Sequence, residues 1–191
     1  MSFSGFGPQA LPFFKALAFH QTKEWFEANR AIYENDVKKP FGDLVEALAA
    51  ALQEAGLPLK GDRKSSLFRL HRDVRFAKDK NPYKTHAGAV LTRSGAKNDP
   101  GLLYIHIDPT GCLVAAGFYY PEPPRLAGFR RSVTDQPGRY RKMIAALQQT
   151  GLALSDGESL TRLPRGFESV ADVDLAAALK RKSFTCSRPV A

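Results

Sequence analysis

Residues 102–121, "LLYIHIDPTGCLVAAGFYYP", contain the pattern on which the fold prediction rests. Two runs rich in apolar and aromatic residues, 102–108 and 112–121, flank the turn sequence "PTG". Runs of this kind separated by a short turn containing glycine are typical of a β-hairpin. The stretch therefore predicts two adjacent antiparallel strands.

Two further strands are expected before this hairpin. "SSLFRLHRD" at 65–73 alternates apolar and polar residues, and "HAGAVLTR" at 86–93 is a short, mostly apolar run. Strands this close in sequence pair more readily as an antiparallel meander than through parallel crossover units. We therefore expect a mostly antiparallel sheet.

Helical patterns precede and follow the strands. Thr22 is the expected N-cap of the second helix, and Pro40 stands where a third can begin. The expected helices span residues 7–21, 23–39, 40–55, 124–134, 137–150 and 172–181. Helices, then strands, then helices predict one α+β domain over 1–191, with a sheet of about four to six strands packed against N-terminal and C-terminal helices.

Positive charge is concentrated in two blocks. The chain of 191 residues has a net charge of +9, and residues 60–86 alone contain nine Lys or Arg and three Asp. Residues 125–142 contain six Lys or Arg and one Asp. If both blocks lie on one face, they form a patch that attracts anions.

The first block surrounds a proline turn in "FRLHRDVRFAKDKNPYKTHAG", residues 68–88. Pro82 excludes a helix here, so the segment is expected to be an irregular loop between two strands. Arg suits two-pronged binding of a carboxylate or phosphate, Asp can orient it, and Tyr can line a pocket. The candidate ligand-binding residues are Arg69, Arg72, Asp73, Arg75, Lys78, Asp79, Lys80, Tyr83 and Lys84.

A structural interpretation of the same loop stays open, in which Asp–Arg and Asp–Lys pairs only hold its conformation. His106 shares a predicted strand face with Tyr104 and Asp108, and His71 similarly with Asp73. These pairs could act as acid and base. We predict no metal site, because no short metal motif occurs and neighbouring cations repel a metal.

Much of the sequence resembles a family of uncharacterised proteins found in bacteria and some fungi. The resemblance is carried by residues 68–89 and extends to 5–6, 23–40, 103–123 and 179–184. It implies a domain of unknown function and supplies no reaction. Ala77 replaces a Ser of the family pattern, which excludes a serine nucleophile there, and "HQ" at 20–21 replaces an Asn pair. The pattern also leads us to expect a terminal helical segment beyond "CSRPVA".

The sequence thus predicts binding of a phosphate- or carboxylate-bearing small molecule at residues 69–86, and leaves open whether hydrolysis or group transfer follows. The alternative is a nucleic-acid-binding module that uses both basic blocks. No Walker loop, GxSxG elbow or dinucleotide motif occurs, so no cofactor is expected. Cys112 and Cys186 lack CxxC spacing, and no signal peptide or membrane span is recognisable, which favours a cytoplasmic protein. Ligand identity and oligomeric state are not indicated.

Overall fold

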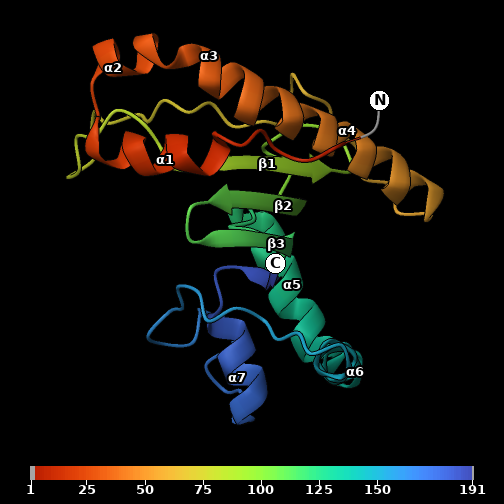
Figure 1. Ribbon diagram of the computed structural model, residues 1–191. Helices are drawn as coiled ribbons and strands as arrows, with labels where there is room; N and C mark the ends of the chain where they lie inside the picture. Colours follow the sequence, from red (N-terminus) through yellow and green to blue (C-terminus); the bar gives the residue numbers. More distant parts are fainter. Residues whose placement is uncertain (1–2, 191) are drawn as a thin grey trace. The chain divides into compact units, whose positions relative to one another are not determined.

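A four-stranded antiparallel sheet of order β1-β2-β3-β4 forms the frame of the computed structural model, which describes residues 3–190 (Figure 1). The strands are β1 (Ala87–Thr92), β2 (Gly101–Asp108), β3 (Gly111–Phe118) and β4 (Phe184–Val190). The hairpin predicted from residues 102–121 is confirmed as β2 and β3. At its turn, Asp108 Oδ1 accepts hydrogen bonds from the backbone N–H groups of Thr110 and Gly111, at 2.6 and 3.1 Å.

The prediction of a continuous strand at 65–73 is wrong. Within it, only the isolated antiparallel bridges Leu67–Ala89 and His71–Tyr83 form. The fourth strand is instead β4, whose sequence "FTCSRPV" has no clear alternation and contains Pro189. Because β4 lies at the end of the strand order, Pro189 can be accommodated without a central ladder hydrogen bond being lost.

The helical predictions are confirmed with shifted ends, except that the residues expected to form one helix over 23–39 form three consecutive helical elements. The helices are α1 (Ala10–Phe19), α2 (Lys23–Ala28), α3 (Arg30–Ile32), the π-helix η1 (Tyr33–Lys38), α4 (Lys39–Glu54), α5 (Pro123–Asp135), α6 (Pro137–Gln149) and α7 (Val173–Lys180). Thr22 Oγ1 caps α2 by accepting the N–H of Trp25 at 3.2 Å. The helix expected to begin at Pro40 is confirmed as α4, with Pro40 in its first turn, where the missing N–H is tolerated.

The described residues group into two compact units. Unit 1 consists of the chain up to Asp99, Leu103–Val114 and the last residues of β4, and unit 2 consists of Pro100–Leu102 and Ala115–Arg188. The first basic block, 60–86, lies in unit 1, and the second, 125–142, in unit 2. That the chain is one domain stays a prediction.

The core of unit 1 joins the N-terminal helices to β1 and β2. Phe14, Leu17, Val45 and Leu91 are each 0 % exposed and belong to one cluster that also contains Ile107. Burial of this apolar area is the main stabilising contribution to the unit. Because Ile107 points into the core, its strand neighbours point to the opposite face of β2.

The core of unit 2 is smaller and consists of Val133 of α5 with Leu175, Ala178 and Leu179 of α7. A group of aromatic rings adds to the packing of α5. Phe129 of α5 packs edge-on against Phe118 at 4.6 Å and Phe184 at 5.7 Å between ring centroids. Gly117 has a φ of +132°, and a Cβ there would lie 2.1 Å from the carbonyl oxygen of Phe184. Only glycine therefore allows β3 and β4 to approach this closely.

Candidate functional site

The predicted loop between residues 72 and 80 is held mainly by its own carboxylates. Asp73 accepts two hydrogen bonds from the Arg75 guanidinium, at 3.0 and 2.7 Å. Asp79 accepts a hydrogen bond from Arg72 Nη1, which also donates to the Asn81 carbonyl at 3.2 Å. These hydrogen bonds lower the pKa of both Asp side chains, together with backbone N–H groups that lead the contribution at Asp79.

The lysines of the same loop are also directed at the protein or at water. Lys80 Nζ donates to the Val74 carbonyl at 3.0 Å and to the Arg75 carbonyl at 3.4 Å. Lys78 is exposed. The structure thus pairs Arg72, Arg75 and Lys80 with acceptors inside the loop, as the structural interpretation of this segment requires.

Tyr83 anchors the loop to the core of unit 1. Its side chain is 4 % exposed and stacks on Phe26 with ring centroids 4.8 Å apart. Its backbone N–H donates to Gln21 Oε1 at 3.0 Å, and Gln21 Nε2 donates to the Leu17 carbonyl at 2.8 Å. Tyr83, expected to line a pocket, is therefore buried, and the amide at position 21 positions the loop.

A groove of about 600 Å³ lies beside this loop within unit 1. The residues lining it are Phe26, Arg30, Tyr33, Glu34, Lys38, Arg63, Lys64, Leu67, Phe68, Arg69, Leu70, His71 and Lys97. Six of these are Lys or Arg and one is Glu, so the wall is strongly positive. The groove has the size of a small-molecule site.

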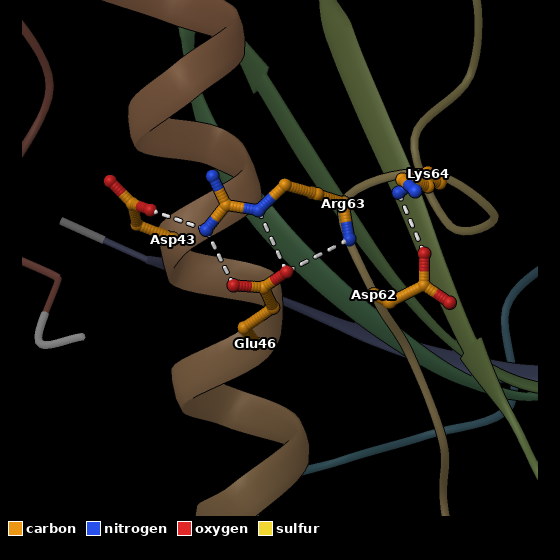
Figure 2. Close-up of polar contacts among 5 residues, drawn as sticks. All are labelled: Asp43, Glu46, Asp62, Arg63 and Lys64. Carbon is orange, nitrogen blue, oxygen red and sulfur yellow. Dashed lines mark hydrogen bonds and ion pairs between the residues drawn. The ribbon is translucent and has the colours of Figure 1, made fainter.

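Three of the six cations in the groove wall are neutralised by carboxylates. Arg63 Nη2 lies 2.9 Å from Asp43 and 2.5 Å from Glu46 on α4, so that two carboxylates surround one guanidinium (Figure 2). These hydrogen bonds raise the pKa of Arg63 above its ordinary value. Arg30 and Lys38 are paired in the same way with Glu27 and Glu34, respectively.

The other three cations form no ion pair with a carboxylate among residues 3–190. The side chains of Lys64 and Arg69 make no hydrogen bond there, and Lys64 contacts Asp62 through its backbone N–H (Figure 2). The charge of Arg69 nevertheless contributes to lowering the pKa of Asp73, after the hydrogen bonds from Arg75. Lys97 Nζ donates to the Leu67 carbonyl at 2.5 Å. All three line the groove.

Phe68 connects these cations to Lys84. The Lys97 and Lys84 ammonium groups lie 5.5 and 5.3 Å from the centroid of the Phe68 ring. Burial lowers the pKa of Lys84, and the charges of Arg69 and Lys97 lower it further. The positive charge here is therefore not fully compensated by the protein, which distinguishes it from the charge of residues 72–80.

Polar side chains on the face of β2 opposite the core form a second cluster in unit 1. His106 Nδ1 lies 3.0 Å from Tyr104 Oη, and His106 Nε2 lies 2.9 Å from Asp108 Oδ2. The His86 ring stacks on the His106 ring at 4.5 Å. Burial lowers the pKa of His86 to about 4, with further contributions from His106 and Lys84. The predicted shared face of Tyr104, His106 and Asp108 is confirmed.

Sequence reasoning missed two residues of the groove as individual contacts. Lys64 was counted only as part of the basic block, and Lys97 lies outside both blocks. No local pattern places Lys97 beside Phe68, because the contact depends on the turn between β1 and β2. A signal was available for Lys64, since it follows Arg63 in a turn between helix and strand.

Among residues 3–190, no group of three or more His, Cys, Asp or Glu side chains is arranged to hold a metal ion. In the same part of the chain, every helix is too short or too polar to cross a bilayer.

The family model described as "Conserved hypothetical protein (DUF2461)" matches residues 9–191. The chain therefore belongs to this family of conserved hypothetical proteins, in agreement with the resemblance seen in the sequence. No curated protein and no solved structure matches the chain.

Proposed function

We propose that this member of the family binds a phosphate- or carboxylate-bearing small molecule in the groove beside Phe68. Lys64, Arg69 and Lys97 would contact the anionic group. Lys84, whose ammonium group also contacts the Phe68 ring, would add positive charge. The observation that carries the proposal is that these cations lie together without carboxylate partners among the residues that the structure describes.

Electrostatics favours an anion at this place. Uncompensated like charges repel one another, and the lowered pKa of Lys84 reflects that repulsion together with burial. A bound anion would relieve the repulsion and accept charge-assisted hydrogen bonds from Arg69. The Phe68 ring and the apolar wall of Leu67 offer a surface for the rest of the ligand.

The site proposed here is narrower than the predicted residues 69–86. Arg69 and Lys84 stay as proposed contacts, whereas Arg72, Arg75 and Lys80 are occupied by acceptors within their loop. Asp73 and Asp79 would then stabilise the loop rather than orient ligand contacts. Hydrolysis or group transfer after binding would require a nucleophile or a general base close to the groove.

A thermal-shift screen of the full chain tests the proposal. Inorganic phosphate, nucleotides and small carboxylates are added at low and moderate salt. We expect one class to raise the melting temperature by about 3–5 °C at roughly ten times its Kd. No shift with any of the three classes would contradict the proposal.

A matched pair of variants locates the binding. Arg69→Ala should weaken binding of the stabilising ligand on the order of tenfold or more, because it removes a charge-assisted contact. Arg75→Ala removes the same charge from the neighbouring loop and should leave affinity unchanged, since Asp73 already holds Arg75. Equal losses in the two variants would favour a diffuse charge effect.

The nucleic-acid alternative predicts a different salt response. Its two basic blocks lie in different compact units, and in the second block Arg141 is paired with Asp172 at 2.5 Å while Arg130 donates to the Leu179 carbonyl at 2.8 Å. Binding of long DNA or RNA that weakens steeply with salt would support this alternative against the small-molecule site.

A further inference from the structure

Three polar side chains on β2 form a linked hydrogen-bond chain. Ile105 and Ile107 are 5 % and 4 % exposed and point into the core of unit 1. Alternation along the strand therefore places Tyr104, His106 and Asp108 together on the opposite face. The two contacts that connect them, at 3.0 and 2.9 Å, both involve the His106 ring.

The hairpin turn fixes the charge state of Asp108. Its Oδ1 accepts from the Thr110 backbone N–H and hydroxyl, both at 2.6 Å, and from the Gly111 N–H at 3.1 Å. Hydrogen bonds from Thr110, with that of His106, hold the pKa of Asp108 well below its usual range. Asp108 is thus ionised at neutral pH and can only accept a hydrogen bond from His106.

The ionised carboxylate determines which ring nitrogen of His106 carries the hydrogen. Because Asp108 accepts, Nε2 is the donor, and in the neutral ring Nδ1 is then an acceptor. Nδ1 lies 3.0 Å from the Tyr104 hydroxyl, which donates to it. The order of donors and acceptors is the one in which a carboxylate orients a histidine base toward a nucleophile.

We propose that Tyr104, His106 and Asp108 form a proton relay in which Tyr104 is a nucleophile. When the Tyr104 oxygen attacks an electrophilic centre, a new bond forms from Oη to that centre and the bond to the leaving group breaks. The phenolic proton passes to His106 Nδ1, and the leaving group departs with the bonding electrons. Asp108 keeps its charge and stabilises the protonated ring.

The surroundings of the relay suit an anionic electrophile such as a phosphate ester. The Tyr104 ring lies 6.3 Å from the Phe68 ring, the same ring that Lys84 contacts at 5.3 Å. A cation at this place would stabilise negative charge that develops in the transition state. This choice of substrate class rests on the proposed function, whereas the relay itself rests on the geometry of β2.

An arylsulfonyl fluoride tests the relay in the full chain without an anionic ligand. The Tyr104 oxygen would bond to sulfur, the sulfur–fluorine bond would break, fluoride would leave, and His106 would take the proton. Mass spectrometry of peptides gives the labelling rate of each tyrosine. We expect Tyr104 to react faster than Tyr119 and Tyr120, although these are 59 % and 44 % exposed and Tyr104 is only partly exposed.

Variants separate activation from accessibility. His106→Gln should lower the labelling rate of Tyr104 on the order of 100-fold, because the general base is lost. Asp108→Asn should also lower it, since an amide no longer imposes the tautomer. His20→Gln, at an exposed histidine in unit 1, is the matched control and should leave the rate unchanged.

Melting temperatures of all variants verify that each one is folded before rates are compared. Labelling of Tyr104 that is slower than that of Tyr119 and Tyr120, or that His106→Gln leaves unchanged in a folded protein, would overturn the relay. Neither result depends on phosphate binding, so failure of the relay and failure of the proposed function can be told apart.

Discussion

Two neighbouring parts of unit 1 are both rich in Lys and Arg, but they differ in how far carboxylates compensate the positive charge. In residues 72–80, Arg72 and Arg75 are paired with Asp79 and Asp73, and Lys80 donates to backbone carbonyls. Around Phe68, Lys64, Arg69, Lys84 and Lys97 form no ion pair with a carboxylate in the described chain, and the charges of Arg69 and Lys97 add to burial in lowering the pKa of Lys84. The density of cations in a sequence is therefore a weaker indicator of an anion-binding site than the positive charge that stays uncompensated after folding.

The largest effect is expected on the structural side of this comparison. Tyr83→Ala should lower the free energy of unfolding by about 3 kcal/mol, because it leaves a cavity beside Phe26 in the core. Tyr83→Phe, which keeps the stacked ring, is the control and should be close to wild type. Urea denaturation measures both. A mild Tyr83→Ala variant would show that the loop is not anchored by this ring.

A smaller effect is expected from removing charge on the binding side. The double variant Lys64→Met with Lys97→Met should weaken phosphate binding on the order of tenfold, because two uncompensated cations of the groove are lost. Lys78→Met with Lys80→Met removes the same charge from the loop and should change affinity little. Calorimetric titration with inorganic phosphate compares the two. A larger loss in the loop variant would reverse the assignment.

A further variant frees an arginine that is paired in the 72–80 loop, so that its effect on phosphate binding can be measured. Asp73→Asn removes the carboxylate that holds Arg75, so the guanidinium becomes available to an anion. We expect a modest gain in phosphate affinity at low salt, about two- to threefold, that disappears in Asp73→Asn combined with Arg75→Ala. If Asp73→Asn binds phosphate more weakly than wild type, Asp73 has an orienting role after all.

The pH dependence of stability follows from the lowered pKa of His86. His86 titrates at about 4 in the folded chain against 6.5 ordinarily, mainly through burial and then through His106 and Lys84. Between these pH values the unfolded chain binds a proton at His86 that the folded chain does not. The free energy of unfolding therefore falls as pH decreases from about 6.5 to about 4.

Lys84→Met tests the part of this shift that comes from uncompensated charge. Removing the ammonium group should raise the pKa of His86 and reduce the loss of stability over the same pH interval. NMR titration of the His86 ring measures the pKa, with Lys78→Met as the control in the exposed loop. An unchanged His86 pKa would show that Lys84 is screened from this cluster.

Several elements could be predicted because their signals are local. The β2–β3 hairpin follows from a turn between two apolar runs, and Thr22 marks the start of α2 through its capping hydroxyl. The pairing of His106 with Asp108 follows from strand alternation. Strand β4 was missed, and residues 33–38 were expected to be helical but not to form the π-helix η1. Neither feature has a periodic signal in the sequence, because both depend on tertiary packing.

The candidate site could be predicted only as a region. Sequence places Arg69 and Arg75 six residues apart with equal charge, and nothing local distinguishes them. Their difference arises because the loop returns Asp73 onto Arg75, while the side chain of Arg69 forms no ion pair or hydrogen bond with a carboxylate among residues 3–190. Lys97 enters the site only through the fold, from a turn beyond β1.

The most direct test of the account is an NMR map of phosphate binding to the full chain. Backbone amide shifts are followed while inorganic phosphate is added at low salt. We expect the signals of Lys64, Phe68, Arg69 and Lys97 to move together in a saturable way, and those of residues 72–80 to stay nearly unchanged. Saturable shifts confined to residues 72–80, or no saturable shift anywhere, would contradict it.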